Sequence, residues 1–149
     1  MILELGWVTP YGDLGDDFAT TELGFGASDG LEACFRWRLH LSPTLSLAPA
    51  FHFANYGNFA TTDEELGDVR IDCTTYRYTL ELLLRTGGRD ATVRPYLAAG
   101  CGLYRNRVVG YTKEFTLSFD ESVNTLGFSL RAGIEVAGLE FSAVYHVNR

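Results

Sequence analysis

The sequence predicts an all-β fold, an antiparallel up-and-down β-barrel of about eight strands, of which seven are clear, built by one domain over residues 1–149. Three observations carry this prediction. Apolar and polar residues alternate with a period of two over long stretches, which is typical of strands with two different faces. The connections between these stretches are alternately short and long, as in a meander of neighbouring strands. No stretch shows the 3.6-residue period of an amphipathic helix.

The alternation is clearest in residues 31–41, where odd positions are Leu, Ala, Phe, Trp, Leu and Leu and even positions are Glu, Cys, Arg, Arg and His. The other six predicted strands, of which the last three alternate more weakly, are residues 76–84, 126–136, 139–147, 2–9, 45–56 and 94–104. Each segment is near or above the roughly 9 to 11 residues with which a tilted strand crosses a bilayer. Pro49 cannot donate to a strand ladder, so we expect a β-bulge there.

The connections predict that the two ends of the barrel differ. Three are short (residues 42–44, 86–92 and 137–138), and three are predicted as long loops rich in Gly, Asp, Asn, Ser and Thr (residues 10–30, 57–68 and 106–122). Most of the acidic residues lie in the long loops. We interpret them as a solvated loop surface, and leave open a divalent cation or a cationic partner.

The composition of the two strand faces indicates which face points into the barrel. A soluble barrel turns its apolar face inward, whereas a transmembrane barrel turns it toward lipid. The polar face here has no lysine, places small residues such as Gly100 and Gly127 beside large ones, and carries nearly balanced Glu and Arg charges. A narrow, filled interior requires these features, because buried charges must be paired. We therefore predict a transmembrane barrel with a plugged polar lumen.

This prediction assigns residues to both faces. The predicted lumen charge network is Glu4, Glu32, Arg36, Arg38, Arg77, Glu81, Arg85, Arg131, Glu135 and Glu140. The predicted lipid-facing residues are Leu31, Phe35, Trp37, Leu39, Tyr78, Leu80, Leu82, Phe128, Leu130, Ile134, Phe141 and Tyr145. Aromatic residues on the apolar face fall near strand ends, as in the girdles of membrane interfaces.

Composition excludes several other classes. The net charge is −7, with 19 acidic against 12 basic residues, so we expect no nucleic-acid partner. No apolar run approaches the roughly 18 to 20 residues of a membrane-spanning helix. The three cysteines have no CxxC spacing and predict neither a zinc site nor a disulfide framework. Strand-like residues follow Met1 directly, so this chain shows no signal peptide. Either the protein stays in the cytoplasm or a leader has been removed, and we expect the second.

Three stretches also resemble a known family. Residues 39–49 look like the strands around a first periplasmic turn, residues 94–104 carry the run Arg-Pro-Tyr-Leu-Ala-Ala-Gly-Cys-Gly-Leu-Tyr, and residues 133–145 look like a penultimate-strand hairpin. Together they resemble small bacterial outer-membrane β-barrel proteins of the eight-stranded OmpA/OmpX type and their porin-like relatives. The resemblance implies the outer membrane of a Gram-negative bacterium, the lipid bilayer as partner and no cofactor. It further implies a structural or interaction role, with the long loops outside the cell facing an unknown partner.

The chain departs from that family at its end. Members finish with an eighth strand that closes on the first, whereas this chain stops at Arg149, after the seventh predicted strand. An open edge in a bilayer leaves unpaired backbone groups that cost several kcal/mol each. Three explanations remain open: truncation, closure by a partner, or an additional strand in residues 20–27.

Other functions are weighed against this hypothesis. In a soluble, lipocalin-like barrel the apolar face would line a pocket for a hydrophobic molecule, and a narrow ion channel is a further alternative. Some outer-membrane lipid A deacylases resemble this barrel and carry a His-x-Ser-Asn motif, but Val147 replaces the serine after His146. We therefore expect no enzyme and no catalytic residue. His40 and His52 are expected to face each other as a satisfied interior pair, and without a third ligand they predict no metal site.

Overall fold

The computed structural model describes residues 2–9, 28–57, 59–63, 67–87, 91–112, 118–137 and 139–148. Its strands are β1 (Ile2–Val8), β2 (Ser28–Arg36), β3 (Leu39–His40), β4 (Leu45–Gly57), β5 (Phe59–Asp63), β6 (Gly67–Arg85), β7 (Val93–Thr112), β8 (Ser118–Val136) and β9 (Leu139–Asn148). Within these ranges, no helix is long and apolar enough to cross a membrane.

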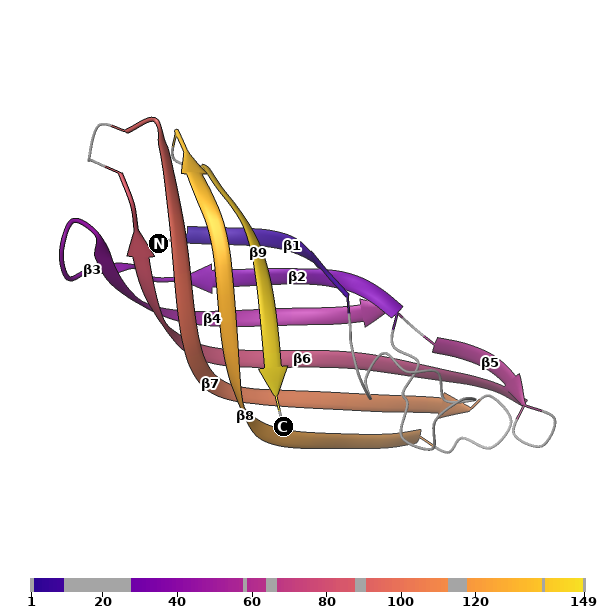
Figure 1. Cartoon of the computed structure of the whole chain (residues 1–149). Coiled ribbons are helices and arrows are strands. Elements are labelled where there is room, and N and C mark those ends of the chain that lie inside the picture. The colour runs from indigo at the N-terminus through magenta and orange to yellow at the C-terminus, as the bar shows by residue number, and fades with distance from the viewer. Residues whose placement is uncertain are drawn as a thin grey trace.

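All the strands belong to one antiparallel sheet. Seven follow a single path, in the order β1-β2-β4-β6-β7-β8-β9. β3 continues the line of β2 along β4, and β5 pairs with the beginning of β6. With β2 and β3 taken as one strand, the sheet has eight strands and curls into a nearly sealed up-and-down barrel (Figure 1). The predicted all-β, antiparallel barrel of about eight strands is thereby confirmed.

The barrel is incompletely closed between its first and last strands. Among the residues that the structure describes, no backbone pairing joins β1 to β9, and we call the gap between them the seam. Side chains bridge it instead: Arg131 on β8 lies 2.7 Å from Glu4 on β1, and Arg36 on β2 lies 3.4 Å from Glu140 on β9. The additional strand considered for residues 20–27 falls outside the described residues.

The two ends of the barrel differ. The connections from β3 to β4, from β6 to β7 and from β8 to β9 lie at one end, which we call the turn end (Figure 1). At the other end β4, β6, β7 and β8 continue past the barrel, together with β5, into an extension. The prediction of long loops over residues 57–68 and 106–122 is therefore wrong in part. β5 and the start of β6 occupy the first range, and β7 and β8 pair through the second as far as Tyr111 opposite Ser118.

Pro49 interrupts the ladder without forming the predicted bulge. Ala50 lies opposite Arg36 and Leu47 opposite Leu39, so each strand contributes the same number of residues between these pairs. The Trp37 N–H donates to the carbonyl oxygen of Pro49 at 2.9 Å. Proline has no N–H to return, and this missing bond separates β2 from β3 while the register is kept.

Small residues inside the barrel make room for large ones. A Cβ added to Gly127 would lie 2.5 Å from Cε2 of Tyr104, and one added to Gly133 would lie 2.7 Å from Cζ of Tyr96. Both tyrosine side chains are buried. The glycines on the inner face of β8 therefore allow two aromatic rings to fill a narrow interior.

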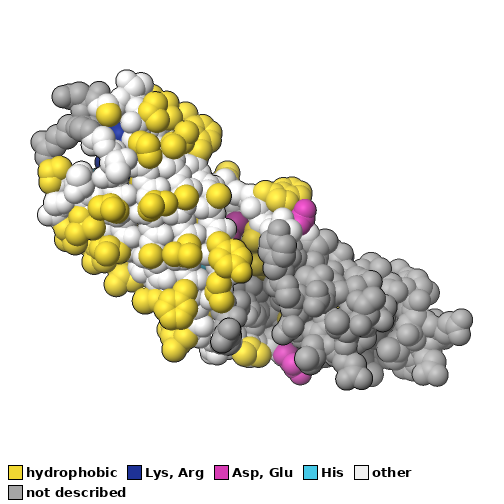
Figure 2. Space-filling model, viewed as in Figure 1, with side chains coloured by type: hydrophobic (Ala, Val, Ile, Leu, Met, Phe, Trp, Pro, Cys, Tyr) yellow, Lys and Arg dark blue, Asp and Glu magenta, His cyan; other side chains and the backbone are white. Residues whose placement is uncertain are grey.

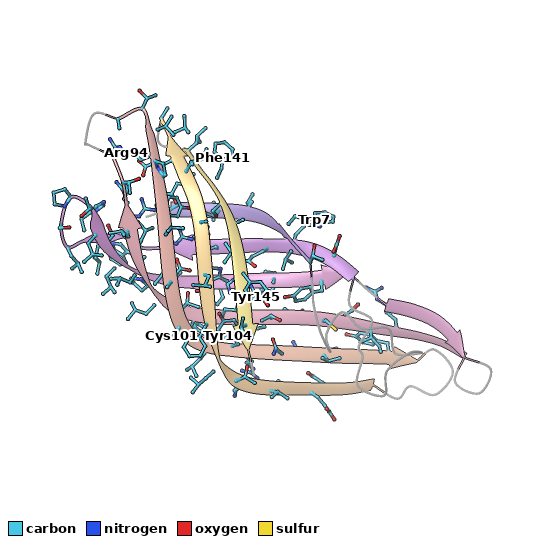
Figure 3. The ribbon with its side chains drawn as sticks, viewed as in Figure 1. Trp7, Arg94, Cys101, Tyr104, Phe141 and Tyr145 are labelled. Atoms are coloured by element: carbon cyan, nitrogen blue, oxygen red, sulfur yellow. The ribbon has the colours of Figure 1, made fainter. Side chains whose placement is uncertain are left out.

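Large apolar side chains cover the outer surface of the barrel (Figure 2). All twelve residues predicted to face lipid lie on this surface, with exposed fractions from 42% for Ile134 to 66% for Leu31 and Trp37. Figure 3 shows Trp7 and Phe141 projecting away from the barrel wall. An exposed apolar surface of this extent is unusual for a monomeric soluble protein.

Candidate functional site: the charged barrel interior

Charged and polar side chains fill the inside of the barrel. Every residue of the predicted lumen network takes part in at least one ion pair with another charged side chain there: Glu4, Glu32, Arg36, Arg38, Arg77, Glu81, Arg85, Arg131, Glu135 and Glu140. Alternation along each strand places them on one face, and the curl of the sheet turns that face inward. The contacts divide into three connected groups.

The central cluster consists of Arg36, Arg131, Glu4 and Glu81. Arg36 forms ion pairs with Glu4 at 2.8 Å and with Glu81 at 3.2 Å, and its hydrogen bond to Glu4 is 2.9 Å long. Arg131 reaches the same two carboxylates, at 2.7 Å and 3.5 Å. Each arginine thus lies between two glutamates. In this arrangement every charge that is largely shielded from water has a neighbour of opposite charge. The planar guanidinium suits this role, because it can donate in two directions at once.

The turn-end cluster gathers three arginines around two carboxylates. Glu135 accepts a hydrogen bond from Arg38 at 3.4 Å and forms ion pairs with Arg85 at 3.6 Å and with Arg94 at 3.5 Å. Arg38 also donates to Glu140, which links this cluster to Arg36 of the central cluster. Arg94 was not among the predicted network residues, although its position on the polar face of its strand was visible in the sequence.

The histidine cluster lies on the side of the interior toward the extension and contains Glu32, His52, His146, Arg77 and Tyr104. His52 Nδ1 donates to Oε1 of Glu32 at 2.7 Å, and Arg77 donates to the other oxygen of Glu32 at 2.5 Å. The Tyr104 hydroxyl lies 3.1 Å from Nδ1 of His146. One ligand atom each from Glu32, His52 and His146 lies within 4.8 Å of the other two.

The expected pairing of His40 with His52 is wrong. His40 is exposed and lies opposite Ser46, near the turn. His52 is fully buried much further along β4, opposite Cys34 on one side and Arg77 on the other. The turn sets a cross-strand register that joins His40 to Ser46, so His52 meets residues of β2 and β9 instead.

Cys34 completes the surroundings of His52. Its sulfur lies 3.7 Å from Nε2 of His52, so a thiol, an imidazole and the Glu32 carboxylate follow one another. A nucleophile–base pair with an orienting acid has this order. However, Cys34 is only 2% exposed, and buried cysteines of this kind are unreactive. The geometry favours a packing role for its thiol, and all three cysteines of the chain are unpaired.

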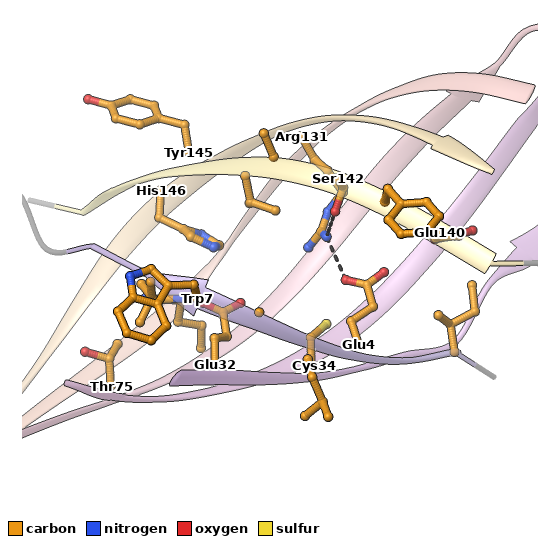
Figure 4. A pocket seen from close by; sticks show the side chains of 18 of the residues that line it. Glu4, Trp7, Glu32, Cys34, Thr75, Arg131, Glu140, Ser142, Tyr145 and His146 are labelled. Carbon is orange, nitrogen blue, oxygen red and sulfur yellow. Dashed lines mark hydrogen bonds and ion pairs between the residues drawn. The ribbon is translucent and has the colours of Figure 1, made fainter. Parts of the chain in front are cut away.

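A cavity of about 1120 Å³ opens along the seam. Residues of β1 and β9 form its edges, and Glu32, Arg77, Arg131 and His146 are among the side chains that line it. Figure 4 shows Arg131, Glu4 and His146 directed into this space. The ion pairs of the central cluster therefore fill part of the interior, and Glu4 and Arg131 of this cluster border the cavity along the seam.

Sequence reasoning missed that Glu32, His52 and His146 meet. The alternation puts each of them on the polar face of its strand, and this was the only available signal. In the sheet, β9 is a neighbour of neither β2 nor β4. The curl of the sheet brings the inner faces of these three strands together across the interior. Local alternation carries no information about such contacts across the interior.

Comparisons with known proteins add no assignment. A scan against protein-family models finds no match for this chain, and searches of curated proteins and of solved structures find none either. The structure itself is a nearly closed, all-strand antiparallel barrel that is compatible with the small β-barrel proteins.

Proposed function

We propose that this protein is an outer-membrane β-barrel of a Gram-negative bacterium, anchored in the lipid bilayer by its barrel and serving a structural or interaction role. One observation carries the proposal. The outer surface changes from polar to apolar at the same level on three neighbouring strands, and the change coincides with a row of aromatic rings.

The change is visible along the single strand β6. Its outward side chains begin with the ion pair of Arg70 and Asp72, 3.0 Å apart, continue with Tyr76 and Tyr78, and end with leucines. The leucines are Leu80, Leu82 and Leu84, each close to half exposed. Water would favour the ion pair, the membrane interface would favour the tyrosines, and the hydrocarbon core would favour the leucines.

The neighbouring strands change at the same cross-strand level. Tyr76 lies opposite Arg105, which lies opposite Asn124, and these are the last polar positions. Two residues further, Tyr78 is aligned with Leu103 and Leu126. From Leu126 to Val136 the outward side chains of β8 are all apolar, over eleven residues. A tilted strand needs about 9 to 11 residues to cross a hydrocarbon core.

Aromatic rings mark the boundary between the two surfaces. Phe51 packs against Tyr78 with ring centroids 5.1 Å apart, and Phe53 packs against Tyr76 at 5.4 Å. Phe51 also stacks on Tyr76 at 6.5 Å. Aromatic girdles at this height are typical of transmembrane barrels, because the rings favour the headgroup region.

The charged interior supports the same proposal. A soluble barrel that binds a hydrophobic molecule would need its Leu, Phe and Trp face inside, and here that face is outside. In a bilayer, charged groups must face the interior and be paired there, as in the central cluster. By analogy with such barrels, the turn end would face the periplasm and the extension would project from the cell.

The role of the protein would then rest on the extension. It offers polar strand faces on a rigid barrel, outside the membrane, where a partner can reach them. The net charge of −7 favours a partner that carries positive charge.

Solubility and depth measurements test the proposal directly. We expect the purified chain to require detergent and to migrate faster in SDS when unboiled than when boiled. In vesicles, lipids brominated along their acyl chains should quench Trp7 and Trp37, the only tryptophans of the chain, both of which are exposed on the apolar face. Trp7→Phe and Trp37→Phe variants assign the quenching to each site. A chain that is monodisperse in buffer alone, with tryptophans that the lipids do not quench, would refute the membrane location.

A further inference from the structure

We infer that Glu32, His52 and His146 form a metal site inside the barrel, suited to Zn²⁺ or a similar borderline dication. This inference goes beyond the proposed function and does not depend on the membrane, since all three residues lie in the interior. Two imidazoles and one carboxylate make a ligand set that zinc uses when one coordination position is left to water.

The three donor groups converge from separate strands. One ligand atom each from Glu32 on β2, His52 on β4 and His146 on β9 lies within 4.8 Å of the others. Zinc holds nitrogen and oxygen ligands at about 2.0–2.2 Å, which places neighbouring ligands roughly 3–3.5 Å apart around one ion. Small side-chain rotations would therefore suffice to close the site, without a movement of the backbone.

His146 provides the clearest sign of an unused ligand. Its Nε2 is buried and has no hydrogen-bond partner among the described residues. Its other nitrogen lies 3.1 Å from the Tyr104 hydroxyl. In the tautomer in which Nδ1 donates to this hydroxyl, Nε2 keeps a free lone pair. Metal-binding histidines are commonly held by a hydrogen bond at the second nitrogen in this way.

The carboxylate is held in a similar manner. Arg77 donates to Oε2 of Glu32 at 2.5 Å and to the Tyr56 hydroxyl at 2.8 Å, which leaves Oε1 directed at His52. Glu81 adds negative charge nearby, because its Oε1 lies 3.8 Å from Nε2 of His52. A dication would take the place of the hydrogen bond between Nδ1 of His52 and Oε1 of Glu32.

The site is open to an ion from one side. Glu32 and His146 both line the cavity along the seam, so an ion could enter there and a water molecule could take the fourth position. A set of two nitrogens and one oxygen discriminates against Ca²⁺ and Mg²⁺, which prefer oxygen ligands alone. Binding of Zn²⁺ should accordingly persist in an excess of either hard cation.

The test is a Zn²⁺ titration of the full chain against a chromophoric zinc chelator, in the medium in which the chain is folded. We expect one ion per chain. His52→Gln and His146→Gln should each weaken binding by more than about 100-fold, whereas Tyr104→Phe, which removes only the supporting hydroxyl, should weaken it by about 10-fold. His40→Gln is the matched control, since it removes the one remaining histidine, which is exposed near the turn.

Two outcomes would overturn the inference: the folded wild-type chain fails to bind Zn²⁺, or His40→Gln loses binding while His146→Gln keeps it. Unboiled mobility in SDS reports folding separately, so loss of the barrel is distinguished from loss of the site. Should His52→Gln not fold, His146→Gln still decides, because its side chain borders the cavity and lies on the last strand.

Discussion

The barrel and its extension are built from the same strands, but the inner and outer faces of these strands have opposite polarity in the two regions. In the barrel, leucines and aromatic residues face out and ion pairs face in. Toward the extension an apolar cluster faces in, formed by Ala54 and Tyr56 where the extension joins the barrel and by Ile71, Cys73 and Val108. Its outward face carries the ion pairs Arg107–Asp120 and Arg70–Asp72. The alternation continues unbroken while the chemistry of its two faces is exchanged, which indicates a change of surroundings along the strand.

The two regions also use the same ion-pair chemistry with different consequences. The Arg36 side chain is fully buried, whereas the Arg107 and Asp120 side chains are 45% and 53% exposed. Removing one partner of a buried pair leaves the other charge buried and uncompensated. Removing one partner of an exposed pair leaves a charge that water solvates. Stability measurements can therefore separate the regions.

The largest expected effect is in the central cluster. Arg36→Met should lower the free energy of unfolding by about 3–5 kcal/mol, because Glu4 and Glu81 lose a shared partner in the interior. A urea titration of the vesicle-folded chain, followed by tryptophan fluorescence, measures this value. Arg107→Met is the matched control in the extension and should cause no measurable change. Equal effects of the two substitutions would show that the central cluster is not a buried network.

The next effect tests the level at which the outer surface changes. Leu130→Arg lies in the apolar stretch of β8 and should cost about 2–4 kcal/mol in a bilayer, whereas Ser122→Arg, eight residues away on the same outward face, should cost about 0–1 kcal/mol. Both substitutions add the same side chain to the same strand. The same urea titration compares them, and a penalty independent of position would place the boundary elsewhere.

A third effect tests how tightly the interior is filled. Gly127→Ala places a methyl group against the Tyr104 ring and should cost about 1–3 kcal/mol through overpacking. Gly6→Ala is the control, because a Cβ there meets no atom within 4 Å and borders the seam cavity. Thermal unfolding of both variants in detergent gives the comparison. If Gly127→Ala were tolerated as well as Gly6→Ala, the interior at Tyr104 would be looser than the structure indicates.

Much of this structure follows from period-two alternation. Both strand faces could be assigned from the sequence because a strand reverses its side chains at every residue, and the turns near Pro43 and Gly138 lie between clear strands. The extension was mistaken for loops because a strand pair in water needs no apolar outer face. Residues such as Arg107, Asp120 and Ser122 therefore have the composition of loops while they pair as strands.

The histidine cluster could not be predicted for a different reason. His52 and His146 are separated by most of the chain, and their strands are not neighbours in the sheet. Their approach depends on how far the barrel closes, which is set by the combined twist and curl of all strands. A sequence pattern places such residues on the inner face and leaves open which of them meet.

The smallest expected effect concerns the pH dependence of the extension. Hydrogen bonds from Arg107, at 2.8 Å and 2.6 Å, lower the pKa of the Asp120 carboxyl below its ordinary value. Because the folded pKa is lowered, the pair stabilises the strands above the unfolded pKa of about 3.9 and loses this contribution as the pH falls through the folded pKa.

Amide hydrogen exchange in β7 and β8 measures this loss. Asp120→Asn should exchange slightly faster than the wild type at pH 6, and the difference should disappear in acid or at about 1 M salt, where exposed charges are screened. The central cluster, shielded from solvent, should keep its salt bridges at the same salt concentration. A difference that grows on acidification would mean that Asp120 is stabilised as the neutral acid. The Arg107–Asp120 pair would then not stabilise the extension as an exposed ion pair, and this difference from the buried pairs of the barrel would be lost.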